Sequence, residues 1–476
     1  MAWCKSQSAD PVEVRLCCLI LGDDPSDRRA CIEALSISLP NAKVLPECAE
    51  LRQALDMAEY EQCDWLLPIH AHDRLAADSE SVLRIALAND PPPIIFWDSD
   101  QIVGGKRCNP FIKPDWDDIL LRDYNLLDGA ALLALPQARA AMQTFSQGAN
   151  EEGISDCLET VLSDCANQPP RHIPLILSHR VSPSQKQNSA VRAAPSNVDA
   201  RCPKICIIIP TRDQARLLSN CLKSIACEDY PGEIELMIID NESSEAETKI
   251  LFDELQRGGE AEVIAFPGEF NFAAMMNDAA RRATGEYLCF LNNDVEALDR
   301  GWLQHLVRNA LAPRVGAVGA RLLYPDGTIQ HAGIAIGIGG AAGHVDKGAR
   351  PDDLWLANWH NATRRVSAVT AACMVVKRSN FLAVGGMDAQ NFAVDFNDVD
   401  LCLKLQSLGF SNIIVSKATL VHHESQSRGV IRTPAQQRRF ERELTALRSR
   451  WKTMEYYDPW HSPLFRSESE RCLLRF

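Results

Sequence analysis

Three short apolar runs in the second half of the chain each end abruptly in polar turn residues. These runs, KICIIIPTRD, IELMIIDNESS and EYLCFLNND, are rich in β-branched and aromatic side chains, which favour strands. The segments between them, ARLLSNCLKSIA and FNFAAMMNDAARRATG, repeat apolar residues at helical spacing, and the second ends at Gly285. Strands that alternate with helices predict a parallel sheet with right-handed crossovers, so the predicted fold class is α/β.

The polar clusters at the three predicted strand ends cover residues 211–213, 240–244 and 292–294. A single cluster of Asn, Asp and Ser is a turn by default. In an open α/β sheet, however, ligands bind beyond the carboxyl ends of the strands, so three successive clusters indicate one shared cleft. Asp294 and its neighbours offer oxygen donors, which suit a hard cation such as Mg²⁺ or Mn²⁺ that would neutralise a diphosphate.

A second acidic cluster, Asp395, Asp398 and Asp400, lies far downstream in NFAVDFNDVDLCLKLQSLGF. Asp398 begins a predicted helix, and acids in a first helical turn either stabilise the helix N-terminus or provide a general base for an acceptor hydroxyl. The predicted apolar stripe of this helix comprises Leu401, Leu405 and Leu408.

Length and composition limit the remaining possibilities. The 476 residues predict two or three domains. A net charge of −14 argues against non-specific binding to nucleic acid or to an anionic membrane. The 17 cysteines are scattered through apolar runs without CxxC pairs, so we expect buried reduced thiols. With neither a signal-peptide pattern nor an uninterrupted apolar run of about 18 residues, the predicted location is the cytoplasm.

Eight motifs occur in the order found in family 2 glycosyltransferases, and the chain is most similar to bacterial rhamnosyltransferase-like enzymes of O-antigen and other surface-polysaccharide assembly. The resemblance covers about residues 203 to 430. The motifs are IIIPTRD, IIDNESS, FNFAAMMNDAARRATGEYLCFLNNDVEAL, VGAVGARLLYPDGTIQHAG, VSAVTAACMVVKR, VGGMD, FNDVDLCLKLQSLGF and VHHESQSRG.

The resemblance implies a GT-A fold and a metal-dependent, inverting transfer of a hexosyl or rhamnosyl group. The donor would be a UDP- or dTDP-sugar, and the acceptor an oligosaccharide or a lipid-linked glycan. By motif position, Pro210, Thr211 and Asp213 would line the nucleotide pocket, and Asp240 would bind the uracil or thymine base. Asp398 would be the general base.

The metal site implied by the resemblance lies at Asn292, Asn293 and Asp294, where the family has Asp-x-Asp. Asn292 and Asn293 would contact the donor, and Asp294 would bind Mg²⁺ or Mn²⁺. A histidine of VHHES, either His422 or His423, would complete the metal site. Arg428 beyond this pair would either bind diphosphate oxygens as a bidentate donor or be a solvated surface residue.

Three positions depart from the family pattern. Asn292 replaces an acid and removes one negative charge from the metal site. The family's VTGAC reads VTAAC here, so an alanine, Ala371, replaces a glycine just before Ala372 and Cys373, where the donor sugar would approach. The added methyl group would either narrow the pocket or be neutral if φ is negative there. Ala279 replaces a glycine inside a helix, where alanine favours helix formation.

The segment GIAIGIGGAAGHVDKG is rich in glycine but has no GxGxxG spacing, so a flexible connection over the acceptor side is a better interpretation than a nucleotide loop. Nearby, the aromatic residues Trp355, Trp359 and His360 would either stack on sugar faces or close the domain core.

The first 180 residues repeat the plan in reduced form, with VRLCCLILG, CDWLLPIHAHD and RHIPLILSHR as strand-like runs. His70, His72 and Asp73 stand in place of the polar triplet, and Asp156 stands at the position of the base. Lost motifs favour a degenerate GT-A-like copy. The predicted domains are therefore residues 1–181, a Ser/Pro-rich linker at 182–200, a catalytic domain at 201–432 and a helical tail at 433–476.

The tail is predicted to form a charged helix from Thr433 that breaks near Asp458 and Pro459. Either it packs on the catalytic domain, with the end of the tail over the acceptor entrance, or it lies on a membrane surface. Peripheral contact with the inner membrane or with other polysaccharide-assembly enzymes is compatible with both. Two other functions stay open, a catalytically silent glycan-binding scaffold and a nucleotidyltransferase.

Overall fold

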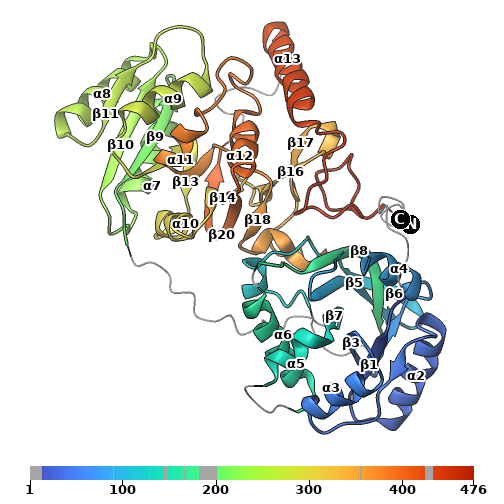
Figure 1. Cartoon of the computed structure of the whole chain (residues 1–476). Coiled ribbons are helices and arrows are strands. Elements are labelled where there is room, and N and C mark those ends of the chain that lie inside the picture. Colours follow the sequence, from blue (N-terminus) through green and yellow to red (C-terminus); the bar gives the residue numbers. More distant parts are fainter. Residues whose placement is uncertain are drawn as a thin grey trace. The chain divides into compact units, whose positions relative to one another are not determined.

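The computed structural model describes residues 13–88, 90–127, 129–143, 148–165, 167–181, 201–353, 356–423 and 433–475. The chain divides into two compact units, residues 1–193 and 194–476 (Figure 1). The predicted linker, Arg428 and Trp355 lie outside the described residues.

The C-terminal unit is built on a mixed ten-stranded sheet with the strand order β11-β10-β9-β12-β19-β14-β20-β13. Strands β9 to β12 pair in parallel, as the alternation of strands and helices predicted, whereas β19 is antiparallel to both of its neighbours, β12 and β14. Two short strands lie off this path, β15 beside β14 and β18 beside β20. The strands are β9 (Ile205–Thr211), β10 (Ile234–Asp240), β11 (Glu262–Ala265), β12 (Tyr287–Leu291), β13 (Val295–Ala297), β14 (Val315–Leu323), β15 (Ile329–His331), β18 (Arg364–Val366), β19 (Cys373–Lys377) and β20 (Ser411–His422).

The helices of this unit bury apolar faces against the sheet. Phe290 of β12 and Phe381 of α11 pack in this core with their ring centroids 5.3 Å apart, and each such buried side chain contributes about 1.5–3 kcal/mol. In α12, Leu401 and Leu405 are buried, but Leu408 is 57% exposed because the helix ends before it. The helices are α7 (Ala215–Ala226), α8 (Ala246–Gly258), α9 (Phe272–Arg282), α10 (Trp302–Ala310), α11 (Arg378–Ala383), α12 (Asn397–Ser407) and α13 (Pro434–Trp451).

Helix α9 ends three residues before Gly285, which the chain needs where it passes β9. A Cβ atom at Gly285 would lie 2.6 Å from the backbone nitrogen of Cys206, which is too close for any other residue. The close approach therefore explains why a glycine stands at position 285, whereas the helix itself ends earlier, at Arg282.

The glycine-rich segment forms a hairpin, β16 (Ile334–Ile336) and β17 (Ala342–His344), that the C-terminal tail holds in place. The Ile336 N–H donates to Asp458 Oδ2 at 2.7 Å, and the Gly339 N–H donates to the carbonyl oxygen of Ser467 at 2.7 Å. This segment is therefore an ordered platform and not the flexible connection that its glycines suggested.

Helix α13 ends at Trp451, seven residues before the predicted break. Lys452 has a φ of 48°, a left-handed conformation that stops the helix. The next residue, Thr453, donates its hydroxyl to the carbonyl oxygen of Gly340 at 2.9 Å. Docking of the tail on the hairpin thus begins earlier than the sequence indicated.

The N-terminal unit repeats the strand order of the C-terminal unit. Its sheet, β2-β1-β3-β7-β5-β8-β4, corresponds strand for strand to β10-β9-β12-β19-β14-β20-β13, and β6 pairs with β5 as β15 pairs with β14. The parallel and antiparallel pairings also agree, so the predicted internal repeat is present. The strands are β1 (Leu16–Leu21), β2 (Lys43–Val44), β3 (Trp65–His70), β4 (Asp73–Leu75), β5 (Ile94–Val103), β6 (Lys106–Phe111), β7 (Ala131–Ala134) and β8 (Arg171–Arg180). The helices are α2 (Pro25–Ser38), α3 (Leu51–Tyr60), α4 (Ser79–Ala86), α5 (Leu135–Ala141) and α6 (Glu151–Asp164).

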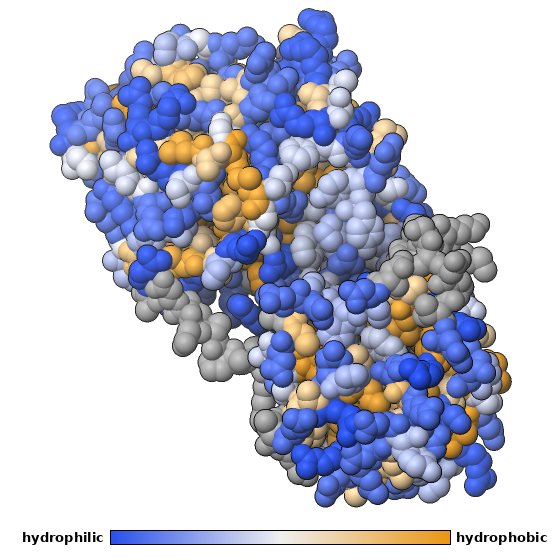
Figure 2. Space-filling view, viewed as in Figure 1, coloured by the Kyte–Doolittle hydropathy of each residue, from blue (hydrophilic) through white to orange (hydrophobic). Residues whose placement is uncertain are grey.

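The surface in the view of Figure 2 is largely hydrophilic, with apolar residues scattered over both units. Within the described ranges, none of the helices is both long enough and apolar enough to cross a membrane. The cysteines in these ranges are free thiols and most are buried, as predicted.

A pair of histidines, the buried His331 and the partly buried His344, joins β15 to the hairpin. His331 Nδ1 and His344 Nδ1 are 2.9 Å apart, and the Thr370 N–H points at His331 Nε2 at 3.4 Å. These two hydrogen bonds are consistent with two neutral rings, in which the His331 Nδ1–H donates to Nδ1 of His344 and His331 Nε2 accepts the Thr370 N–H. Burial lowers the pKa of His344 to about 3 and holds that of His331 well below its usual value.

We expect this pair to make the C-terminal unit sensitive to acid. As the pH falls below the ordinary histidine value of 6.5, the unfolded chain binds protons that the folded pair rejects, so stability falls. His344→Gln keeps an acceptor for His331 and removes one titrating group. Between pH 6 and 4, the slope of the unfolding free energy against pH should decrease by about 1.4 kcal/mol per unit. Urea titrations at several pH values measure this slope. His72→Gln, which removes a histidine of the N-terminal unit, is the control. An unchanged slope would contradict this assignment.

Candidate functional site

The ends of β9, β10 and β12 meet at one edge of the C-terminal sheet, as predicted. Asp240, the last residue of β10, pairs in register with Thr211, the last residue of β9. Asn293 follows β12 and donates from Nδ2 to the Thr211 hydroxyl at 2.8 Å. Parallel pairing therefore brings the three polar clusters together.

Two residues that were predicted to line a nucleotide pocket shape this edge. Pro210 is buried in β9, one residue before Thr211. The Asp213 carboxylate accepts the N–H groups of Glu245 at 2.8 Å and Ser244 at 2.6 Å, and these bonds lower its pKa. Asp213 thus links the loop after β9 to the loop after β10.

Asp294 and His422 form the pair that could hold a metal ion. Asp294 Oδ1 and His422 Nε2 are 3.1 Å apart and buried, and the amide nitrogen of Asn292 lies 3.3 Å from the same Nε2. The other ring nitrogen, Nδ1, lies 2.6 Å from Oε1, the side-chain amide oxygen of Gln330. In metal-binding histidines, one ring nitrogen commonly donates its N–H to such an oxygen, and this hydrogen bond orients the other ring nitrogen toward the ion.

His423 is directed elsewhere. Adjacent residues of a strand point to opposite faces, and His423 Nε2 lies 3.0 Å from Glu296 Oε2. His423 contacts Asp294 only through its backbone N–H, which donates to the Asp294 carbonyl oxygen at 2.9 Å, whereas the ring of His422 lies beside the Asp294 carboxylate.

The side chains of Asp294 and His422 fit a divalent cation that takes most of its ligands from water and from a substrate. No group of three or more His, Cys, Asp or Glu side chains converges within the described part of the chain, so Asp294 and His422 would be the main protein ligands. Mg²⁺ is often bound by one or two carboxylates, water and the phosphates of a substrate. The residues present fit such an ion.

Metal binding provides a test that needs no substrate turnover. We expect His422→Ala to weaken Mn²⁺ binding about 10- to 100-fold, whereas the neighbouring variant His423→Ala should change it less than about threefold. Asn292→Asp supplies a second carboxylate and should tighten binding. Isothermal titration calorimetry measures all three. Equal losses for the two histidine variants would rule out the assignment.

Asp398 occupies the second position of α12. Its Oδ2 accepts the Ala371 N–H at 3.2 Å, and its Oδ1 accepts the Val399 N–H at 2.8 Å. Burial raises the pKa of this carboxyl group even though these N–H bonds oppose the shift. A carboxyl group with a raised pKa is suited to accept a proton.

The other two acids of the cluster are less suited to this role. Asp400 is fully buried and binds Arg450 Nη1 at 2.8 Å and Trp451 Nε1 at 3.0 Å. Asp395 lies 3.8 Å from Arg439. Asp398 is therefore the acid of this helix that we assign to the site.

A cleft of about 580 Å³ brings these parts together. Asn292 and His422 line it from the sheet edge, and Asp398 lines it from α12. Ala371, which stands where the family has glycine, also lines it, and its φ is not positive, so the added methyl group causes no backbone strain. The hairpin β16–β17, helix α13 and Glu470 of the tail form the remaining walls.

Several residues of the site carried no sequence signal. Gln330 lies within the quoted motif GTIQHAG, but nothing in the sequence indicated that it would contact a histidine almost a hundred residues later.

Two aromatic residues of LWLANWHNA, Trp359 and His360, close the domain core, which was one of the two roles that the sequence left open for them. Both are buried, and His360 lies 3.1 Å from Asp346.

The polar triplet of the N-terminal unit does not converge on a metal. His70 lies 3.2 Å from Glu151, and His72 lies 3.3 Å from Asp27. Asp73 accepts the Arg180 Nε–H at 3.0 Å. The three side chains thus have three separate partners.

Arg180 occupies the strand position that corresponds to His422. Asp73 is the first residue of β4 and pairs with Arg180 of β8, just as Val295, the first residue of β13, pairs with His422 of β20. A guanidinium group therefore replaces the imidazole in this copy. Asp156 lines a cleft of about 400 Å³ together with His70 and Glu151. The degenerate interpretation is supported by the guanidinium group at the position of His422.

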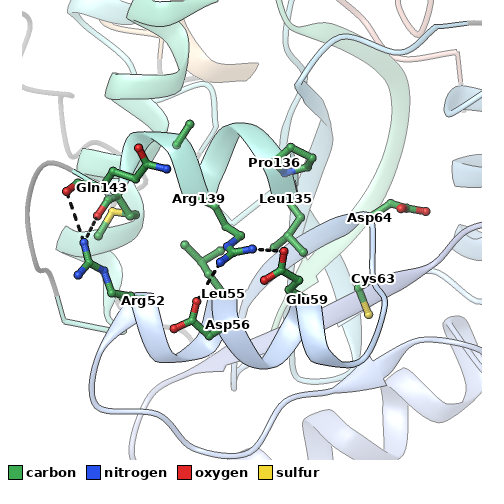
Figure 3. Close-up of a pocket in the computed structure, with 12 residues that line it drawn as sticks. Arg52, Leu55, Asp56, Glu59, Cys63, Asp64, Leu135, Pro136, Arg139 and Gln143 are labelled. Carbon is green, nitrogen blue, oxygen red and sulfur yellow. Dashed lines mark hydrogen bonds and ion pairs between the residues drawn. The ribbon is translucent and has the colours of Figure 1, made fainter.

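A second pocket of the N-terminal unit, of about 620 Å³, lies between α3 and α5 (Figure 3). Its arginines already have partners. Arg139 pairs with Asp56 and Glu59, and Arg52 donates to the carbonyl oxygen of Met142 at 2.8 Å. This pocket is therefore not a candidate for the anionic donor.

Comparison with known proteins identifies a family match within the C-terminal unit. Residues 206–373 match the model of Glycosyl transferase family 2. The chain is 35% identical over 434 residues to the protein y4gI of Sinorhizobium fredii, which covers 82% of this chain and 47% of that protein. It is 29% identical over 436 residues to the O-antigen biosynthesis protein RfbC of Myxococcus xanthus, which covers 83% and 32%.

A third relative matches a shorter region. The N-acetylglucosaminyl-diphospho-decaprenol L-rhamnosyltransferase of Mycobacterium tuberculosis is 29% identical over 169 residues, which cover 34% of this chain and 54% of that protein. The chain spans less than half the length of the first two relatives.

Proposed function

We propose that this chain, whose residues 206–373 match the model of Glycosyl transferase family 2, has the GT-A fold and transfers a sugar from a nucleoside diphosphate to a hydroxyl group of a glycan. The observation that carries the proposal is the shared cleft, which Asn292 and His422 line on one side and Asp398 on another. A donor and an acceptor can meet in this space.

The donor is a UDP- or dTDP-sugar. Asp240 binds the base, Thr211 and Asn293 contact the nucleotide, and Asn292 contacts the diphosphate. Asp294 and His422 bind Mg²⁺ or Mn²⁺, which neutralises the charge of the leaving diphosphate when bound.

The transfer proceeds with inversion at the anomeric carbon. The acceptor oxygen forms a bond to this carbon while the bond from the carbon to the diphosphate oxygen breaks. Asp398 accepts the proton of the acceptor hydroxyl, and the nucleoside diphosphate leaves. The raised pKa of Asp398, caused by burial, favours this proton transfer.

The acceptor is an oligosaccharide or a lipid-linked glycan of surface-polysaccharide assembly. The relatives named for O-antigen biosynthesis and for rhamnosyl transfer to a decaprenol-linked sugar support this class. A lipid-linked acceptor would bring the protein into peripheral contact with the inner membrane.

The products decide between the proposal and its alternatives. The protein is incubated with Mn²⁺, an oligosaccharide or lipid-linked glycan acceptor and either dTDP-L-rhamnose or UDP-glucose, and the released nucleotide is identified by mass spectrometry. A glycosyltransferase releases dTDP or UDP, whereas a nucleotidyltransferase releases or consumes pyrophosphate. If a wider panel of nucleotide sugars gives neither turnover nor a thermal shift with metal present, the scaffold alternative is favoured.

Asp398→Asn tests the general base. We expect the transfer rate to fall about 10²- to 10⁴-fold, while nucleotide affinity stays within about threefold, because the variant keeps the shape of the residue and the donor half of the cleft. Asp395→Asn changes a carboxyl group three residues earlier, in the loop that leads into α12. Its transfer rate should fall at least tenfold less than that of Asp398→Asn. Equal rates for Asp398→Asn and the wild type would exclude this residue as the base.

The pH profile provides a further test. A general base acts only when ionised, so kcat/KM should fall as the pH drops through the pKa of Asp398. Because burial raises this pKa above 3.8, the acid limb should lie above the range of an exposed aspartate. The residual activity of Asp398→Asn should lack this limb.

A further inference from the structure

The C-terminal helix α13 lies outside the region that matches the family model, yet it contacts the chain on both sides of Asp398. It binds the loop at Val394 and Asp395, which leads into α12, and it binds Asp400, which follows Asp398 by two residues. Asp398 itself is held by two backbone N–H groups. The orientation of its turn therefore depends on the neighbouring contacts.

Glu443 makes the contact before α12. This residue is only 3% exposed, and its Oε2 accepts the N–H groups of Asp395 at 2.6 Å and Val394 at 3.3 Å. Arg439, one turn earlier on the same helix, lies 3.6 Å from its Oε1. A buried carboxylate with two backbone donors fixes the path of the loop, since loss of the acceptor would leave buried N–H groups without a partner.

The loop that Glu443 holds contains a strained residue. Phe396 immediately precedes α12 and has a φ of 62°, which is unfavourable for a bulky side chain. Its ring packs against Phe440 of α13, with the ring centroids 5.5 Å apart. Such strain persists only where surrounding contacts enforce it, and here α13 supplies them.

Arg450 and Trp451 make the contact after Asp398. Both donate to Asp400 Oδ1, at 2.8 Å and 3.0 Å, and Arg450 also donates to Asp388 at 2.7 Å. These bonds anchor the end of α13 to the same turn of α12.

We propose that α13 positions the general base, and that Glu443 is the positioning residue that holds the strained turn in front of Asp398. The proposal rests on the assignment of Asp398 as the base. Glu443 does not line the cleft, so it acts through the position of the turn and not by contact with a substrate.

The local effect is measured by hydrogen–deuterium exchange of the whole protein without a substrate. Glu443→Ala should raise the exchange of residues 393–400 about tenfold or more. Glu441→Ala changes an exposed glutamate on the same helix and should leave that segment unchanged. An unchanged segment in Glu443→Ala, or a rise spread evenly over the C-terminal unit, would overturn the proposal.

Two conservative variants separate position from charge. Glu443→Gln keeps an oxygen at the same reach, so kcat should fall less than about fivefold. Glu443→Asp keeps the charge but withdraws the oxygen by one carbon, so kcat should fall about 10- to 100-fold, with the donor KM within about threefold. The readout is release of dTDP or UDP from the sugar donor. A larger loss for Gln than for Asp would contradict a positional role. The Asp variant also carries the test if Glu443→Ala does not fold.

A double variant identifies the route of the effect. If Glu443 acts through Asp398, adding Glu443→Asp to Asp398→Asn should reduce the residual rate less than about twofold. A fully additive loss would show that Glu443 acts by another route. If Asp398→Asn is as active as the wild type, the proposed base fails. If Asp398→Asn is inactive and Glu443→Asp is fully active, only the positioning role fails.

Discussion

The antiparallel register between β13 and β20 is the constraint on which the candidate site depends. Val295 pairs with His422, so the strand turns His422 toward Asp294 and His423 toward Glu296. A slip of one residue would exchange the two side chains. The pairing of β20 with β14 has two register shifts, but residues 419–421, directly before His422, pair without a break with residues 321–323 of β14, and this pairing opposes such a slip.

The sequence predicted the half of the site that lies on regular elements. Strand ends could be located because apolar runs stop at polar residues, and Thr211, Asp240 and Asn293 do meet at one sheet edge. The start of the helix that carries Asp398 was predicted to within one residue. The internal repeat in the N-terminal unit was also predicted, whereas the order of its strands comes from the structure.

The other half depends on contacts between segments far apart in the sequence. No local pattern distinguishes His422 from His423, because only the pairing of β20 with β13 decides which one faces Asp294. Likewise, Glu443 appears in the sequence as one acid among many on a charged helix. The early end of α13 has the same cause, since the docking of Thr453 on Gly340 competes with continued helix.

Because Arg180 stands in the N-terminal repeat at the position of His422, a chelating agent would affect the two copies of the fold differently. Under the proposed function, a divalent ion bound to Asp294 and His422 could be withdrawn, whereas the guanidinium group paired with Asp73 is a permanent part of its strand. One copy of the fold thus carries a fixed positive charge at this position, and the other would acquire one only by binding an ion from solution. Depletion of divalent ions would act on the C-terminal copy and leave the charge of the N-terminal one intact.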